Sequence, residues 1–240
     1  MPEFRKPHHR TVARMLAAFD AGFLERAGCY FGGGTQIALS LGEFRESRDI
    51  DFLCSSRTGF RLLRETVASD SLGALLSRPL ELAREVRADR DGVRTFLGAG
   101  EVRIKLEVVF EARIELSGQL DRKLGVPTLD LASAVAEKFL ANADRGLDES
   151  TGSRDIVDLA FLAAAHGPKA LEPGYRLAEA AYGKAVPRYT RLVLDKFAAE
   201  RRYAARCARA LGVDDIATLR KGLVLLRGFA PPAKRAVRSG

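Results

Sequence analysis

Hydrophobic and polar residues alternate regularly between Glu101 and Phe110 of this chain. The even-numbered positions from 104 onward are apolar, whereas the positions between them include Lys105 and Glu107. Successive side chains of a β-strand point to opposite faces, so this pattern predicts a strand with one buried and one polar face.

A shorter alternating run places two acids on one face of a second predicted strand. Asp49 and Asp51 are two positions apart, while Ile50 and Phe52 fill the opposite face. Two ionised carboxylates this close repel each other unless a cation lies between them. A hard divalent ion such as Mg²⁺ suits such a pair, because it takes few carboxylates and shares the rest of its coordination with phosphates. The alternative is an acidic pair in a solvated loop.

A glycine turn precedes the acid pair. Gly33 and Gly34 allow the backbone to approach a ligand closely, and Thr35 is expected to open a short helix over residues 36–41. The free N–H groups at the start of a helix form an anion site of phosphate size. The sequence therefore predicts a phosphate-binding turn one helix away from the acids, although such a turn can also be a simple helix cap.

A third acid, Glu107, lies on the polar face of the longer strand. If both strands belong to one sheet, Glu107 completes a three-carboxylate cluster with Asp49 and Asp51. Lys105 shares the face of Glu107 and would offset the negative charge of phosphates. The alternative is a solvated polar face with a cross-strand ion pair.

Other patterns predict an α+β chain whose second half is helical. Gly92 and the turn at residues 98–100 are expected to separate strands in the region 84–117. We expect an N-terminal helix at 11–26, a helical stretch at 60–82, a β-meander at 84–117, and a helical bundle from Pro127 onward with breaks at 167–168, 173–174, 187 and 212.

Four ordered segments resemble those of the nucleotidyltransferase superfamily with the polymerase-beta-like fold, and more narrowly the AbiEii/AbiGii toxin family, to which the MenT toxins are related. These segments are Phe31-Gly-Gly-Gly-Thr-Gln-Ile-Ala-Leu39 with Arg48-Asp-Ile-Asp-Phe52, Ile104-Lys-Leu-Glu107, Leu131-Ala-Ser-Ala-Val-Ala-Glu-Lys-Phe-Leu-Ala141 with Arg145, and Arg154-Asp-Ile-Val-Asp-Leu159. The gap between Thr35 and Asp49, which contains Gly42 and Glu43, is longer than in the family pattern.

The resemblance implies a polymerase-beta-like nucleotidyltransferase domain at residues 1–126, with a mixed or antiparallel sheet and flanking helices. A helical domain at residues 127–240 would contribute to the active-site cleft. The resemblance also implies that Asp49 and Asp51 bind metal, that Lys138 contacts phosphate and that Asp155 is a further active-site acid.

The third and fourth segments are informative in their own right. Lys138 and Arg145 are seven residues apart on one predicted helix, so they share a face that suits a triphosphate. Ser153 is expected to cap the next helix, where Asp155 and Asp158 lie on one face. These two acids could complement the positive helix end, pair with Lys138 or position an acceptor.

Charge is concentrated at the C-terminal end of the chain. The whole chain has a net charge of +8, and residues 185–240 alone contain 13 Lys or Arg and 4 Asp or Glu. Arg201, Arg202, Arg206 and Arg209 lie within a few turns of one predicted helix. Such a surface favours the phosphate backbone of RNA. A solvated arginine-rich face and an acidic protein partner are the alternatives.

Composition favours a cytoplasmic enzyme of 240 residues. No apolar run is long enough to cross a membrane, and no signal-peptide core follows Met1. The cysteines are Cys29, Cys54 and Cys207, which lack metal-binding spacing and are expected to be reduced. The first histidines, His8 and His9, are given no role because they lie so near the terminus.

The residues and the resemblance together predict transfer of a nucleoside monophosphate from an NTP to an acceptor, with two Mg²⁺ ions. Asp49, Asp51 and Glu107 would hold metal, while Gly33, Gly34, Thr35, Lys105 and Lys138 would contact the nucleotide. The expected acceptor is RNA, including tRNA as the MenT relationship implies. The expected setting is a type IV-like toxin–antitoxin or abortive-infection system with a cognate antitoxin. The alternatives are a small-molecule nucleotidyltransferase of the antibiotic-modifying type and a catalytically silent nucleotide-binding protein.

Overall fold

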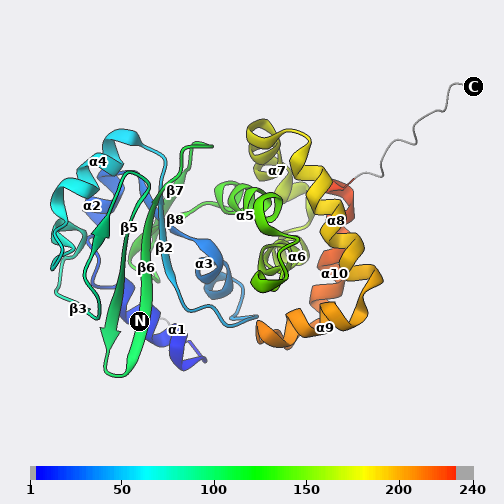
Figure 1. Ribbon diagram of the computed structural model, residues 1–240, viewed down its shortest axis with the longest axis horizontal. Helices are drawn as coiled ribbons and strands as arrows, with labels where there is room; N and C mark the ends of the chain where they lie inside the picture. The colour runs from blue at the N-terminus through cyan, green and yellow to red at the C-terminus, as the bar shows by residue number, and fades with distance from the viewer. Residues whose placement is uncertain (1–3, 231–240) are drawn as a thin grey trace, which may run out of the picture.

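The computed structural model describes residues 4–230, which form a mixed sheet followed by a helical half (Figure 1). The strands are β1 (Cys29–Gly32), β2 (Ile50–Cys54), β3 (Glu81–Leu82), β4 (Arg87–Ala88), β5 (Gly92–Ala99), β6 (Val102–Phe110), β7 (Gly118–Asp121) and β8 (Val126–Leu129). Their order across the sheet is β3-β5-β6-β2-β1-β8-β7, and β4 pairs with β5. The expected α+β fold is confirmed. The expected basic tail, 231–240, lies outside the described residues.

Helices flank the sheet and form the second half of the described chain. They are α1 (Pro7–Leu16), α2 (Ala21–Arg26), α3 (Gly33–Ser40), α4 (Arg57–Thr66), α5 (Leu131–Arg145), α6 (Arg154–His166), α7 (Pro168–Tyr182), α8 (Ala185–Ala199), α9 (Arg201–Ala210) and α10 (Ile216–Leu226), with short 3₁₀ turns at Gly73–Leu75, Glu149–Thr151 and Arg227–Phe229. None of the helices within residues 4–230 is long and apolar enough to cross a membrane.

Strands β2 and β6 show the predicted alternation of buried and polar residues. β2 and β6 are parallel neighbours, and β1 is antiparallel to β2 on its other side. Ile50, Phe52, Leu106 and Val108 are fully buried in a core against the N-terminal helices. The polar faces of both strands consequently point to the other side of the sheet.

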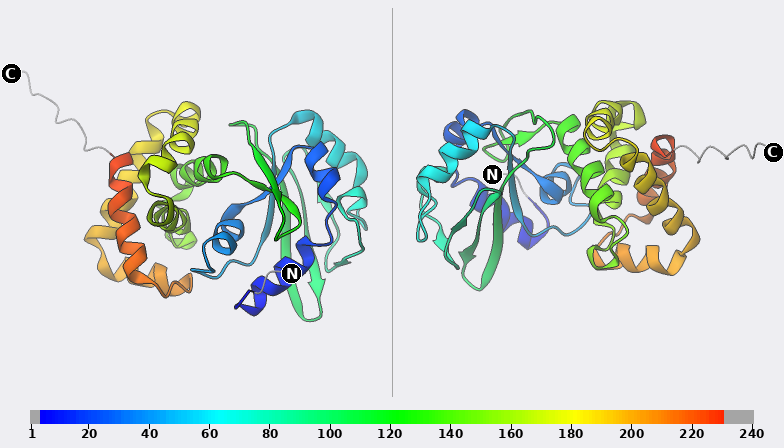
Figure 2. Two further views of the ribbon diagram at one scale, coloured as in Figure 1. Left: turned by 180° about the vertical axis from the view of Figure 1, so that it is seen from behind. Right: turned by 45° about the horizontal axis from the view of Figure 1, so that its top comes forward.

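Helix α3 lies between the sheet and the helical half, as the views in Figures 1 and 2 agree. It packs against β1 and β2 on one side and against α5 and α6 on the other. Ile37 joins the core of the helical half, whereas Leu39 joins the core of the sheet. The segment after the glycine turn therefore connects the two halves of the molecule.

Several boundaries differ from those expected. The N-terminal helix is divided into α1 and α2, because the side chain of Asp20 accepts a hydrogen bond from the N–H of Phe23 and starts a new helix. The stretch at 60–82 is helical only in α4 and one 3₁₀ turn, since the backbone becomes extended at Val67, with a ψ of 146°, and ends α4 there.

Three proline predictions were also wrong, and one of them is the break expected at 187, because Pro187 lies in the first turn of α8. Pro127 lies in strand β8, so the helices begin at Leu131; a proline fits a strand position whose N–H is not needed in the ladder. Pro173 lies inside α7 without ending it. The next residue, Gly174, packs directly against α5, where a Cβ would overlap the carbonyl of Ala132. Pro173 has no N–H and cannot donate the usual hydrogen bond within the helix, and the close packing of Gly174 compensates for that loss.

Candidate active site

The acids of β2 and β6 meet on the face of the sheet that carries their polar residues. Asp51 is paired in register with Glu107 on β6 and with Gly32 on β1. Asp49 immediately precedes β2 and is half-buried. Residues in register on neighbouring strands point to the same face, so the expected placement of Glu107 beside Asp51 is confirmed.

The glycine turn passes directly over Asp51. Gly33 has a φ of 73°, and a Cβ at this position would overlap the Asp51 carboxylate. A Cβ on Gly34 would likewise overlap the guanidinium of Arg45. The helix begins at Gly33 and not at Gln36, because only residues without side chains fit between these groups. The start of α3 therefore lies beside the acids.

The side chain of Thr35 bonds within the protein. Its side chain is fully buried, and its hydroxyl lies 2.7 Å from that of Ser47. Ser47 belongs to the loop that leads to Asp49, so this hydrogen bond holds the loop against the first turn of α3. The backbone around Thr35, rather than its hydroxyl, remains available for an anion.

The carboxylate of Glu107 is already paired. Arg94 of β5 donates to it at 3.2 Å and Lys105 at 2.5 Å. Within residues 4–230, no three His, Cys, Asp or Glu side chains are arranged to hold a metal ion. The three-carboxylate cluster is therefore not assembled here, and its formation around a metal stays a prediction.

Asp49 and Asp51 have a different environment from Glu107. Among the described residues, neither carboxylate accepts a hydrogen bond or forms an ion pair at contact distance. Burial, with the charges of Asp49 and Glu107, raises the pKa of Asp51 to about 6. Uncompensated carboxylates that repel one another fit a divalent cation, so the donor set agrees with the expected metal.

A buried chain of ion pairs faces the acids from the helical half. The Nζ of Lys138, on α5, lies 2.9 Å from Asp155 and 2.7 Å from Asp158, both on α6. Arg45 donates to both oxygens of Asp158, at 2.6 and 3.0 Å. Arg145 donates to both oxygens of Asp155, at 2.8 and 3.1 Å. Lys138 and Arg145 do share one face of α5, and both use it to hold Asp155.

The two cations of α5 in these ion pairs differ in solvent exposure. The side chain of Lys138 is only 7% exposed, whereas that of Arg145 is 40% exposed. Burial lowers the pKa of Arg145, but Asp155 and the more distant charges of Asp144 and Asp51 raise it above its ordinary value. Arg145 therefore lies within electrostatic reach of Asp51 and remains open to solvent.

Comparison with known proteins identifies the family of this chain. The family model described as "Nucleotidyl transferase AbiEii toxin, Type IV TA system" matches residues 14–222. The chain belongs to this AbiEii family. It is therefore a nucleotidyltransferase toxin of a type IV toxin–antitoxin system, for which an NTP substrate and an antitoxin are implied.

Solved structures show the same fold at low sequence identity. A candidate nucleotidyltransferase from Helicobacter pylori is 16% identical, with a TM-score of 0.53, and the match covers 92% of this AbiEii chain and 93% of that one. JHP933 from Helicobacter pylori is 15% identical, with a TM-score of 0.53 and coverage of 95% and 94%. Among curated proteins, none matches the sequence.

Sequence reasoning missed the residues that position the acid loop of this AbiEii chain. His9 lies 2.9 Å from Glu43 through Nδ1, and its Nε2 accepts the N–H of Ser47 at 3.3 Å. Burial would raise the pKa of Glu43, but the N–H groups of Lys6 and Arg5 and the bond with His9 lower it to about 2. The φ of Glu43 is 62°, which a non-glycine residue rarely adopts.

Arg45 was also missed, because it lies in an irregular loop where no periodicity marks a buried residue. Its partner Asp158 was considered, and pairing with Lys138 was one of the alternatives left open. The structure confirms this pairing. The unusually long gap before Asp49 was the available signal, because both Glu43 and Arg45 lie in it.

Proposed function

We propose that this protein transfers a nucleoside monophosphate from an NTP to RNA with the help of Mg²⁺. The observation that carries the proposal is the position of Asp51, between Glu107 in the sheet and the glycine start of α3. Uncompensated carboxylates that attract a cation and backbone N–H groups that attract phosphate are thus adjacent.

Asp49 and Asp51 are the residues that would hold the metal, with Glu107 joining them if it leaves Arg94 and Lys105. Bound divalent ions would supply neutralisation of the phosphate charge and polarisation of the reacting oxygens. The N–H groups at Gly33 and Gly34 would bind phosphate oxygens. Both glycines let the turn pack directly against the Asp51 carboxylate and the Arg45 guanidinium, so its N–H groups lie beside the proposed metal ligands.

The cations of the helical half have separate roles in this proposal. Arg145 is partly exposed and lies within electrostatic reach of Asp51, so it would bind the triphosphate and orient it. Lys138 would contact phosphate only after exchanging one of its two aspartate partners, and until then it positions Asp155. Asp155 in turn fixes the guanidinium of Arg145 through two hydrogen bonds.

In the proposed reaction, an oxygen of an RNA hydroxyl attacks the α-phosphorus of the NTP. The bond from this phosphorus to the oxygen that bridges to the β-phosphate breaks, pyrophosphate leaves and the hydroxyl proton passes to water. The basic surface of α9 supports RNA as acceptor, because Arg202 and Arg206 are exposed on its outer face. The nucleotide would thus bind between the two halves, and the RNA on the helical half.

The test is incubation with α-³²P-labelled NTPs, Mg²⁺ and total RNA. We expect label in RNA with the wild type and none with Asp51→Asn. Asp91→Asn is the matched control, because Asp91 is an exposed acid in the turn before β5. Label on an aminoglycoside instead of RNA would support a small-molecule enzyme, and NTP binding without transfer would support a silent protein. Either result would overturn the proposal.

A second measurement tests the RNA-binding surface. Arg202→Glu combined with Arg206→Glu should weaken RNA binding and reduce the dependence of log affinity on log salt by about two. Transfer that stays unchanged in this double variant would exclude the outer face of α9. The metal and nucleotide assignments would be unaffected by that result.

A further inference from the structure

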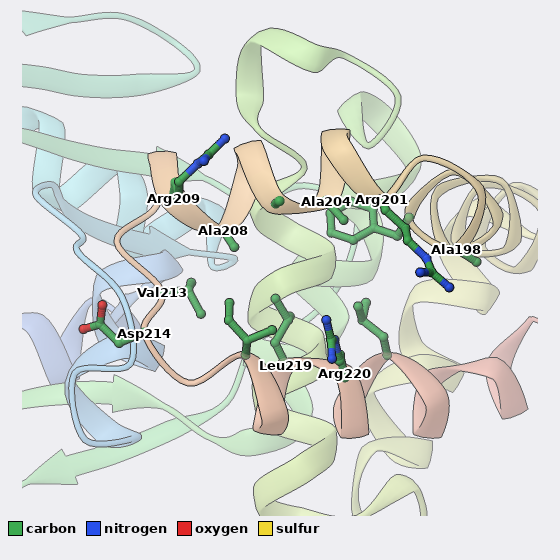
Figure 3. A pocket seen from close by; sticks show the side chains of 13 residues that line it. Ala198, Arg201, Ala204, Ala208, Arg209, Val213, Asp214, Leu219 and Arg220 are labelled. Carbon is green, nitrogen blue, oxygen red and sulfur yellow. The ribbon is translucent and has the colours of Figure 1, made fainter.

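A groove between α9 and α10 has no role in the nucleotide site. The two helices lie side by side and are joined at one end by residues 211–215 (Figure 3). α9 packs against α8 and α10 against α6, so the helices leave a hollow of about 700 Å³ between them. Its lining is mainly apolar and includes Ala204, Ala208, Val213, Leu219 and Leu223.

Both helices present the same spacing to the groove. The lining residues of α9 are 201, 204, 205, 208 and 209, and those of α10 are 216, 219, 220 and 223. Apart from Arg209, both sets have the i, i+3, i+4, i+7 spacing by which helices pack against other helices, and the members other than Arg201 and Arg220 are apolar. On α10 the stripe is partly uncovered, since Ile216 is 38% exposed. The alanines of α9 would let a third helix approach closely.

The polar residues of the groove are mostly arginines. Arg201 reaches into it from α9 and Arg220 from α10, while Asp214 lies at the joined end and Arg209 points outward (Figure 3). Among the residues that the structure describes, none is placed to form an ion pair with Arg201 or Arg220. A partner that fills the groove would therefore need acidic groups beside its apolar surface.

We propose that this groove binds an amphipathic helix of a protein partner, with its apolar side inward and acidic residues beside Arg201 and Arg220. α9 and α10 have 10 and 11 residues, so the groove accommodates about three turns of helix. This is the helix-in-groove mode of recognition. The inference does not depend on the proposed RNA acceptor.

Charge and surface chemistry argue against other occupants. Residues 231–240 of this chain include Lys234, Arg235 and Arg238 and no acid, so they do not complement the arginines. RNA bases bind best to exposed aromatic rings. The aromatic ring among the described lining residues is that of Phe197, which is only 5% exposed.

The joined end of the two helices contacts the loop that leads to the acids. The N–H of Glu46 donates to the carbonyl of Leu211 at 3.0 Å, at the joined end of the two helices. A helix bound in the groove would lie next to this contact. Protection from hydrogen exchange is therefore expected in α9, α10 and residues 211–215.

The test uses the full chain and a synthetic fluorescent peptide of about 18 residues, with leucines at helical spacing and glutamates beside them. We expect saturable binding with a dissociation constant in the micromolar range, about 10⁻⁶ to 10⁻⁵ M. A scrambled peptide of the same composition and a peptide with lysine for glutamate should bind at least about tenfold more weakly.

Variants locate the binding. Arg201→Glu combined with Arg220→Glu should weaken binding of the acidic peptide by at least about tenfold. Arg202→Glu combined with Arg206→Glu, on the outer face of α9, should leave it unchanged. Circular dichroism of each variant checks that the fold is kept.

Four results would overturn the proposal. They are equal binding of the scrambled peptide, no binding at about 10⁻⁴ M, displacement of the peptide by RNA, and a dimer of this chain that the Arg201 and Arg220 variants dissociate. RNA displacement would assign the groove to nucleic acid, and the dimer would assign it to a second copy. None of these results bears on the metal and nucleotide assignments.

Discussion

Lys138 and Asp155 form a buried ion pair, with Nζ 2.9 Å from Oδ1, between α5 and α6. Burial alone would raise the pKa of Asp155, but Lys138 and Arg145 hold it well below its ordinary range. Burial alone would likewise lower the pKa of Lys138, but Asp155 and Asp158 raise it. Both groups are therefore charged at neutral pH and depend on each other.

Lys138→Met should destabilise the protein strongly, because it leaves Asp155 and Asp158 without their shared cation. Removal of one partner of a buried pair costs about 3–5 kcal/mol. We expect a loss of this size in the free energy of unfolding measured with urea. Arg206→Met is the control, because the Arg206–Glu149 pair is more than half exposed on both sides and should contribute less than about 1 kcal/mol. Similar losses in the two variants would contradict the structural role of Lys138.

The local part of the candidate site could be predicted from the sequence. The two alternating runs placed Asp51 and Glu107 on polar strand faces, and the structure pairs these residues in register. Alternation alone does not say which strands are neighbours, because that depends on contacts between distant segments. The sequence therefore predicts the cluster only on the condition that the two strands belong to one sheet, and the structure meets this condition.

The long-range part could not be predicted in the same way. Lys138 has the spacing of a surface cation on an amphipathic helix, but α6 covers it with two acids. Arg45 lies in an irregular loop and is buried only because Asp158 comes from 113 positions away. Burial of a charged group depends on such tertiary partners, which no local pattern reports.

Gly33→Ala should abolish nucleotidyl transfer. The added Cβ would overlap the Asp51 carboxylate, and the φ of 73° is strained for alanine. Gly125→Ala separates these effects, because Gly125 has a φ of 76° and nothing within 4 Å of its expected Cβ. Both variants should lose about 1 kcal/mol of stability from backbone strain, but only Gly33→Ala should lose transfer and NTP binding. An active Gly33→Ala enzyme would show that the turn does not contact phosphate.

Asp51→Asn should lose transfer without losing stability. Asp51 is half-buried beside Asp49 and Glu107, so removal of its charge relieves repulsion. In metal-free buffer at neutral pH we expect the variant to be as stable as the wild type, or more stable by about 1 kcal/mol. Urea unfolding with and without excess EDTA measures this difference. A variant that is less stable would mean that Asp51 supports the fold through contacts beyond its charge.

Arg113 connects the two halves of the molecule through a second group of acids, which includes Glu111 and Glu137. Glu111, which follows β6, is buried, and Arg113 bonds both of its oxygens, at 2.9 and 3.0 Å through Nε. Arg113 also contacts Glu137 at 3.4 Å and Asp144 at 3.1 Å, both on α5. Burial and the charge of Glu111 raise the pKa of Glu137 to about 8.

Glu137→Gln should reduce the pH dependence of stability. The ordinary pKa of glutamate in an unfolded chain is about 4.3. Between that value and the raised pKa, the folded protein binds more protons than the unfolded chain, so the free energy of unfolding falls as pH rises. Glutamine removes this loss. The difference in the free energy of unfolding between variant and wild type should therefore increase by at least about 1 kcal/mol, in favour of the variant, from about pH 5.5 to about pH 8.5. Urea unfolding at both pH values measures the change. Glu65→Gln, at an exposed ion pair with Arg61, should follow the wild type, and a Glu137→Gln slope equal to that of wild type would show that Glu137 ionises normally.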